Sequence, residues 1–513
     1  MVTFSAIAFS ISVLWVLKKV VYWYSAPRRP PYPPGPKPKP FIGNALDFPL
    51  ANSSERYADW GKQYNSGILH LEALGNHIII LNSVEDADEL LEKRAGNYSD
   101  RPEIPMIKLM GWDFTMILMP HNDEWRLHRR ITHQNFRQAE APKYYPIQIE
   151  KVHEMLRNLL EKPEDFDDHN KLLSISFPLS SMYGYNARSL NDPCVEIADK
   201  IAVNVAKLLL PGGNFVDMFP ILGKIPAWVP GAISVRTAAL LRGWTEEMKR
   251  IPTEYLKKQF AEGKAVPSLV TDMLERKFAG TISPEEEEAI HSIAYTIYSA
   301  ASDTTISATK AFFYYMAKHP EIQRKAQAEI DRVVGTKRLP DFSDRDSGDM
   351  PYLEAIYREV LRMSTPVPLC VPHAASEDDY YKGYFIPKGA TVFANIWAMS
   401  HDENRYPDPF TFKPERFLDE SGKLNGDDRI LAYGFGRRVC VGKYLASSIL
   451  WLMMASVLAC FNIDNAKDEN GNCIEIDDTF EEMGLVRHKK NFRCSFNVRS
   501  TEALHLIQST SAA

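Results

Sequence analysis

The strongest constraint in this sequence is a cysteine set in a run rich in glycine and arginine, residues 433–442 (YGFGRRVCVG). The three glycines allow tight turns and let a flat partner approach the backbone closely. Amide groups of these turns and the cations of Arg437 and Arg438 would act on one sulfur, that of Cys440. A helix expected to begin just after Gly442 adds its positive end. Because such surroundings favour a thiolate, and a thiolate here needs a metal, we expect Cys440 to be a metal ligand.

The remaining cysteines, the composition and the charge exclude several classes of protein. Six cysteines in 513 residues, with no CxxC pair, form neither a disulfide-dense scaffold nor a CxxC-type zinc site. Sixty Lys and Arg against 66 Asp and Glu give a net charge of −6, which is too mild for a dedicated nucleic-acid binder. Hydrophobic residues make up 45% of the chain, enough for a large core. No HExxH, GxSxG or Walker motif is present.

Residues 1–24 predict a transmembrane anchor. Residues 1–17 carry no charged side chain, and Lys18 and Lys19 can snorkel to the interface, so that the apolar stretch is long enough to span. A cleaved signal peptide is the alternative, but it would carry its positive charge before the apolar run and a small-residue cleavage site after it. The positive-inside rule places the body of the protein in the cytosol, so the sequons at Asn52 and Asn97 should stay unglycosylated.

Residues 25–40 form a proline-rich hinge in this interpretation, with eight prolines from Pro27 to Pro40. Such a run cannot be helical and favours extended polyproline II. It would act as a stiff linker that also fixes the tilt of the body on the membrane. No linker divides residues 41–513, which we expect to form one large domain, although length alone favours about three.

The sequence of residues 41–513 predicts a mainly α fold with small β-sheets, of the α+β class. Residues 67–82 predict a hairpin, and residues 84–94 predict a helix. The pattern from about 120 to 362 is mostly helical, and strand-like runs return at 384–394. A long apolar helix is expected after the cysteine run, ending near Leu458.

The longest helical pattern covers residues 284–319. It should begin with a capping box in which Ser283 is the N-cap and Glu286 the third helical residue, with Pro284 at the first.

The middle of this pattern contains Asp303 and Thr304, with the small residues Ala300 and Ala301 on the face of Thr304. Small residues there leave room for a diatomic ligand over a metal. The alternative is an ordinary core helix whose threonine bonds back to its own backbone. Asp303 favours the functional interpretation, because a carboxylate in an apolar helix is costly without a role.

The cysteine run resembles the haem-binding loop of cytochromes P450, F-[GS]-x-G-x-R-x-C-x-G. Its matching positions are Gly434, Gly436, Arg438, Cys440 and Gly442, and Tyr433 stands where phenylalanine is usual. A hydroxyl near the sulfur could alter the hydrogen bonding of that sulfur. The long helix resembles the oxygen-activation motif [AG]-G-x-[DE]-T-[TS] of the same family, with Ala301 where glycine is usual, which would narrow the oxygen groove.

Further elements of that family follow in order along residues 30–500. Glu359 and Arg362 resemble its ExxR helix and Arg416 its PERF element, which implies a buried charge triad bracing the loop below the haem. Trp125 and Arg129 resemble its WxxxR helix. The resemblance implies that these two residues, His373 and Arg438 contact the haem propionates, although a lone histidine is often structural.

The resemblance implies a cytochrome P450 fold and a monooxygenase. Haem b would be held by the Cys440 thiolate, with Gly436 in the cradle, and Asp303 and Thr304 would organise proton delivery for dioxygen activation. The chain has no flavin or NADPH module, so electrons would come from NADPH through a separate membrane-bound cytochrome P450 reductase. Arg129, Arg130, Arg437 and Lys443 are candidate docking cations, with solvated surface charge as the alternative.

The substrate is expected to be a lipophilic small molecule. Residues 104–119 would line the pocket, and the apolar stretch 216–232 would dip toward the bilayer. Residues 362–373 resemble fungal biosynthetic P450s of the O-methylsterigmatocystin oxidoreductase-like group, which implies oxidation of a terpenoid, polyketide or aromatic scaffold in secondary metabolism at the endoplasmic reticulum.

Two other functions remain open from sequence. A haem-thiolate isomerase or dehydratase would need no dioxygen, but the pair Asp303–Thr304 argues against it. A membrane-anchored haem-binding protein without turnover is the second.

Overall fold

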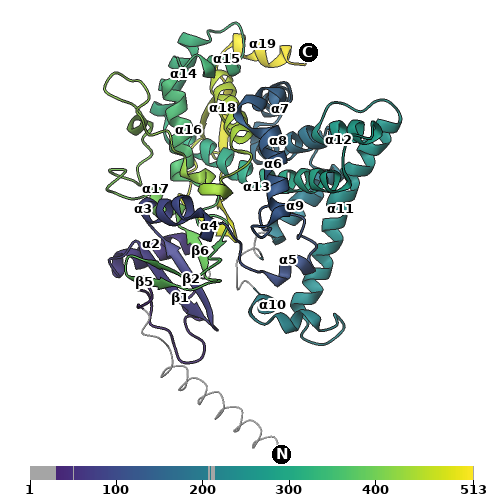
Figure 1. Ribbon diagram of the computed structural model, residues 1–513. Helices are drawn as coiled ribbons and strands as arrows, with labels where there is room; N and C mark the ends of the chain where they lie inside the picture. Colours follow the sequence, from purple (N-terminus) through teal and green to yellow (C-terminus); the bar gives the residue numbers. More distant parts are fainter. Residues whose placement is uncertain (1–29, 50, 206–207, 209–213, 512–513) are drawn as a thin grey trace, which may run out of the picture.

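Helix α13 (Pro284–Lys318) runs through the middle of the helical part of the molecule in the computed structural model, which describes residues 30–49, 51–205, 208 and 214–511 (Figure 1). The Ser283 hydroxyl accepts the N–H of Glu286 at 3.2 Å, and Pro284 occupies the first turn, as predicted. The reciprocal half of the capping box was predicted wrongly, because the Glu286 carboxylate pairs with Arg276 at 2.8 Å instead.

Long helices surround α13 and bury its apolar residues in one core. Helix α8 packs along it, and α9, α12, α16 and α18 also contact it. The long helices are α6 (Asp123–Phe136), α7 (Tyr145–Glu161), α8 (Phe166–Tyr183), α9 (Pro193–Val205), α11 (Ile233–Ala261), α12 (Leu269–Phe278), α14 (Pro320–Val333), α16 (Pro351–Met363), α18 (Lys443–Cys460) and α19 (Thr501–Ser509).

Helix α18 begins directly after Gly442, as the sequence predicts. Within the described ranges it is the one helix long and apolar enough to cross a membrane, but 72% of it is buried inside the protein. It is therefore a core helix. The predicted anchor, residues 1–24, lies outside the described residues.

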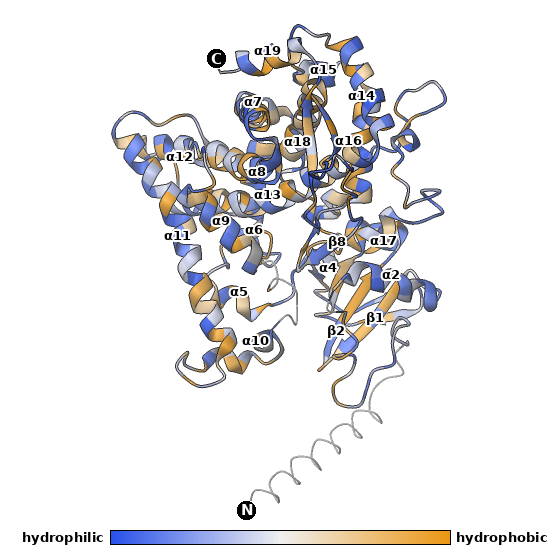
Figure 2. Ribbon diagram, turned by 180° about the vertical axis from the view of Figure 1, so that it is seen from behind, coloured by the Kyte–Doolittle hydropathy of each residue, from blue (hydrophilic) through white to orange (hydrophobic). Residues whose placement is uncertain are grey.

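The predicted hairpin is present as β1 (Ile68–Ala73) and β2 (Asn76–Leu81). A four-stranded sheet has the order β1-β2-β6-β3, in which β6 (Thr391–Ala394) runs parallel to β2 and β3 (His373–Ala374) antiparallel to β6. This sheet lies at the lower left in Figure 1, beside α2, and Figure 2 colours β1 and β2 as largely hydrophobic.

The strand-like runs predicted over 384–394 are present as two strands. Strand β5 (Tyr384–Ile386) pairs with β4 (Asp379–Tyr381), whereas β6 joins the larger sheet. Pro387 lies between them, and it has no N–H to continue a ladder. Two further pairs complete the sheets: β7 (Phe461–Asn465) with β10 (Cys494–Val498), and β8 (Phe480–Met483) with β9 (Val486–Lys489).

The helix expected over 84–94 is irregular. It starts as α3 (Val84–Ala87), capped by Ser83, and continues as a π-helix, η1 (Asp88–Lys93). The remaining helical elements, of which α2 with 11 residues is the longest, are α2 (Ser53–Gln63), α4 (Ala95–Tyr98), α5 (Pro105–Leu109), η2 (Gln138–Tyr144), η3 (Pro163–Asp165), α10 (Phe215–Met218), η5 (Pro220–Lys224), α15 (Phe342–Asp346), α17 (Ile396–Ser400), η6 (Pro414–Phe417), η7 (Leu431–Tyr433) and η8 (Gly436–Arg438).

The described part of the proline-rich segment lies against the sheets. The carbonyl of Pro31 accepts the N–H of Phe385 at 2.9 Å, and that of Pro34 accepts the N–H of His70 at 3.0 Å. A Cβ on Gly35 would come within 2.1 Å of the His70 carbonyl oxygen, so only glycine permits this close approach. The described residues thus form a mainly helical protein with small sheets, as predicted.

Candidate active site

The cysteine loop is fixed by backbone contacts on both sides. The N–H of Cys440 donates to the Tyr433 carbonyl at 2.8 Å, and Gly434 takes a φ of 78° between them. Gly436 has a φ of 55°, and a Cβ there would come within 2.1 Å of the Leu91 carbonyl oxygen. Its missing side chain is therefore explained by packing of the loop on η1.

Cys440 is an exposed residue that protein nevertheless desolvates. Burial raises the pKa of its thiol, while the Gly442 amide and the cations of Arg129 and Lys443 lower it in part. An amide and nearby cations thus act on the sulfur in the direction that the sequence predicts, although burial outweighs them. A bound metal would supply the missing stabilisation.

Three arginines close to this loop donate to carbonyl groups. Arg129 Nη1 bonds the Val439 carbonyl at 2.8 Å, Arg438 Nη2 bonds that of Met119 at 2.7 Å, and Arg101 bonds carbonyls including that of Pro372 at 2.7 Å. Burial lowers the pKa of all three guanidinium groups.

Buried cations of this kind require anions, so the cluster fits a group with carboxylates, as the propionates of haem provide. Arg129 is turned inward, which corrects its expected role as a surface docking cation. Arg101 was missed, because no motif in the sequence marks it.

Trp125 and His373 complete this region. The Trp125 ring is buried and lies 4.2 Å from the Arg438 guanidinium carbon. His373 Nδ1 bonds the Tyr98 carbonyl at 2.8 Å, but its buried Nε2 has no hydrogen-bond partner among the described residues. Burial lowers the pKa of this imidazole. A carboxylate beside Nε2 would favour the charged ring and satisfy the orphaned atom.

The middle of α13 is less buried than the part of the helix that follows it. Ala300, Ala301 and Thr304 are each half-buried, whereas most residues later in the same helix are buried. The Thr304 hydroxyl donates to the Ala300 carbonyl at 3.0 Å, which is the bond of the core-helix alternative. Its oxygen keeps lone pairs that can accept a further hydrogen bond.

Asp303 has a partner that the sequence analysis missed. Its Oδ1 lies 3.0 Å from Nε2 of His488, on strand β9. The two residues are far apart in the chain, and no spacing rule connects them.

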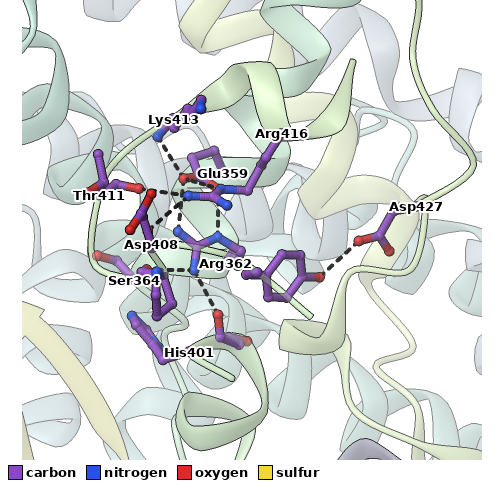
Figure 3. A network of polar contacts seen from close by, with 12 residues as sticks. Glu359, Arg362, Ser364, His401, Asp408, Thr411, Lys413, Arg416 and Asp427 are labelled. Carbon is purple, nitrogen blue, oxygen red and sulfur yellow. Dashed lines mark hydrogen bonds and ion pairs between the residues drawn. The ribbon is translucent and has the colours of Figure 1, made fainter. Parts of the chain in front are cut away.

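A buried charge network lies on α16 (Figure 3). Glu359 contacts Arg362 at 2.6 Å and Arg416 at 3.0 Å, and its side chain is fully buried. It also accepts the N–H of Lys413 at 2.8 Å. The residues proposed as a triad are therefore brought together.

Helix α16 also reaches the cysteine loop. The hydroxyl groups of Tyr357 and Tyr433 lie 2.8 Å apart. The extra hydroxyl of Tyr433 is thus engaged by Tyr357, which braces the loop from this side.

The comparisons with known proteins agree with this geometry. The model of the Cytochrome P450 family matches residues 33–496. This chain belongs to the cytochrome P450 family. Members of the family bind haem through a cysteine thiolate, and the chain is accordingly a haem-dependent P450 monooxygenase.

Named fungal P450s are similar over nearly the whole chain. Cytochrome P450 monooxygenase ple1 of Rhodocybe pseudopiperita is 40% identical over 98% of this chain and 96% of its own. Cytochrome P450 monooxygenase COX2 of Coprinopsis cinerea is 39% identical, over 93% and 91%. Tryptamine 4-monooxygenase of Psilocybe cyanescens is 36% identical, over 96% and 98%.

Proposed function

We propose that this P450 inserts one oxygen atom of O2 into a lipophilic small molecule of terpenoid, polyketide or aromatic type, in fungal-type secondary metabolism. Electrons come from NADPH through a separate cytochrome P450 reductase. The protein is held in the endoplasmic reticulum membrane by residues 1–24, with the catalytic domain in the cytosol. The name of the tryptamine 4-monooxygenase supports an aromatic substrate among these classes.

Cys440 carries the proposal, because its side chain is exposed, the Gly442 amide bonds its sulfur, and Arg129 and Lys443 lie close enough to lower its pKa in part. Cys440 would ligate haem iron as a thiolate, and Arg101, Arg129, Arg438, His373 and Trp125 would hold the propionates. Thiolate-ligated haem supplies the chemistry of O–O cleavage. The backbone of Gly436 would belong to the same cradle.

The residues in the middle of α13 would have two roles, which are to leave room for a ligand and to transfer protons. Ala300 and Ala301 leave room beside Thr304, whose oxygen can accept a hydrogen bond from water or substrate. Asp303 supplies a carboxylate next in sequence, so the pair can bring protons to the oxygen site.

Residues 104–119, the segment expected to line the substrate pocket, would form the roof of that pocket. Phe114 lies edge-on to Tyr295 of α13, with 5.9 Å between ring centroids, and Lys249 of α11 lies 4.3 Å from the Phe114 ring centroid. The segment thus spans between α13 and α11, as a substrate-binding loop requires. Aromatic walls of this kind favour a lipophilic substrate.

Exposed apolar residues support membrane contact beside this roof. They gather on and around η5 and the start of α11, seen with orange segments beside α10 in Figure 2, and comprise Phe219, Ile221, Trp228, Ile233 and Leu240. Trp228 is 82% exposed. A surface of this kind is stable when it lies at a membrane interface.

The reductase would dock beside the cysteine loop. A hollow of about 810 Å³ is lined there by loop residues Tyr433, Gly434 and Val439, together with Lys443. Arg437 is exposed on the same loop. Docking at this hollow would bring the electron donor close to Cys440.

Loss of the thiolate spectrum tests the proposal. Cys440→Ala should abolish the 450-nm-type band of the reduced, carbon monoxide-treated protein. Cys370→Ala is the matched control, because Cys370 lies beside the same loop, 3.6 Å from where a Cβ on Gly434 would be. Retention of the band in Cys440→Ala, or its loss in Cys370→Ala alone, would contradict the assignment.

A further inference from the structure

The contact between His488 and Asp303 joins the α13 carboxylate to a strand at the C-terminal end of the chain. The Nε2–Oδ1 distance is 3.0 Å, and the two side chains are 20% and 19% exposed. Each is therefore shielded by protein but still reached by solvent.

Strand β9 is fastened to the same face of α13 by a second bond. The Ser307 hydroxyl, one helical turn after Asp303, donates to the Arg487 carbonyl at 2.5 Å. Lys310 of α13 also donates a hydrogen bond to the Asn491 side chain, just after the end of β9, at 2.6 Å. The position of His488 is thus set by the packing of the hairpin on the helix.

The charges on the hairpin separate by face. Glu481 lies directly opposite His488 on β8, so both point to the same face, and Glu481 is exposed. Arg487 and Lys489 alternate to the opposite face. Arg487 pairs with Glu55 and Glu482, and Lys489 donates to the Thr479 carbonyl. Asp303, through its contact, and Glu481, through the strand register, therefore lie on the same side as His488.

We propose that His488 passes protons from solvent to Asp303, a role that rests on the proposed monooxygenase function. Nδ1 takes a proton from water on the side of Glu481, and Nε2–H gives its proton to Asp303 Oδ1, from which it moves toward Thr304. The ring ends neutral with its tautomer changed, and it resets by rotation or by proton exchange with water. Imidazole suits this step because one nitrogen can accept while the other donates. The electrons arrive separately from the reductase.

The test compares His488→Gln with wild type as full-length, haem-loaded protein with saturating reductase. Glutamine can still donate a hydrogen bond to Asp303 but cannot carry a proton. We expect NADPH oxidation to fall about tenfold, with a larger solvent deuterium isotope effect, since positioned proton transfer contributes about 100-fold or more when no bypass exists. Asp303→Asn should behave alike, and the double variant should be no slower than Asp303→Asn.

Two controls separate this role from a structural one. Oxidation of the dye ABTS driven by cumene hydroperoxide needs no proton from this route and should change less than twofold. His505→Gln, on exposed α19, makes the same chemical change elsewhere and should leave every measurement at the wild-type value.

Each outcome decides the proposal. An unchanged NADPH rate and isotope effect in His488→Gln would overturn it. Equal losses in the NADPH and hydroperoxide reactions would also overturn it, by showing a merely structural role. A wild-type protein without the thiolate spectrum would instead refute the proposed function.

Discussion

Glu359→Gln removes a buried charge on which two arginines depend, so the structure predicts a large loss of stability. The Glu359 carboxylate is the shared partner of Arg362 and Arg416, whose side chains are 3% and 7% exposed. Replacing this carboxylate by the glutamine amide leaves two buried cations without a counter-charge. The NH2 group of the amide is also a hydrogen-bond donor, so it faces guanidinium groups that have only donors to offer. Breaking a buried pair by removing one partner costs about 3–5 kcal/mol.

The magnitude can be converted into a melting temperature. An unfolding entropy of about 2.1 cal/mol/K per residue gives about 1 kcal/mol per degree for a chain of this length, so the variant should melt about 3–5 °C lower. Because Arg362 also bonds the Ser400 and Pro409 carbonyls, loosening it disturbs the segments between α16 and the cysteine loop. We therefore expect less haem per mole of protein as well.

The assay is thermal unfolding together with haem content by the carbon monoxide difference spectrum. Glu415→Gln is a matched control on η6, because Glu415 pairs with the exposed Lys325 and is itself 33% exposed. A pair of this kind contributes about 0–1 kcal/mol. If Glu359→Gln melts within 1 °C of the control and binds haem normally, the account of this network as a buried brace is refuted.

Three further predictions follow from single contacts. Thr304→Ala should bind haem normally but divert NADPH electrons to hydrogen peroxide, measured as peroxide per NADPH; unchanged coupling would remove Thr304 from the proton route. Tyr433→Phe should cost about 1 kcal/mol in thermal unfolding by depriving Tyr357 of its partner, with the thiolate spectrum unchanged; a shifted band would show that the hydroxyl acts on the sulfur. Burial raises the pKa of Asp217, which accepts the N–H of Met106, to about 6. The folded protein then binds this proton more tightly than the unfolded chain, so its contribution to stability falls as pH rises from about 4 to 6. Asp217→Asn should show a smaller fall in melting temperature between pH 5 and 7, and equal slopes would contradict this.

Local sequence rules predicted the elements whose cause lies within a few residues. The hairpin β1–β2, the start of α13 at Ser283 and the start of α18 after Gly442 all follow from turn, capping and hydrophobic patterns. Local rules failed where a partner outside the segment decides. Glu286 pairs with Arg276 instead of its own cap, and the two strands found within 384–394 join different sheets, which their sequence did not indicate.

In the candidate site too, features with a local cause could be predicted from the sequence, and features that depend on distant segments could not. The spacing of Glu359 and Arg362, and the glycines around Cys440, are visible in the sequence because each depends on backbone geometry over one turn. The pKa of Cys440 could not be predicted, since it depends on how much protein surrounds the sulfur, and burial outweighs the nearby amides and cations. Arg101 was invisible for a related reason, because its desolvation comes from segments elsewhere in the chain.

The sequence by itself therefore determined the family, the cysteine loop and the order of the helical elements, because those features repeat short-range patterns of backbone and side chain. Only the tertiary structure decided which charges meet. The pairing of Asp303 with His488 and that of Tyr357 with Tyr433 each join residues from separate elements. Such pairs form when packing of the core brings distant segments within hydrogen-bond distance, and spacing along the chain does not encode that distance.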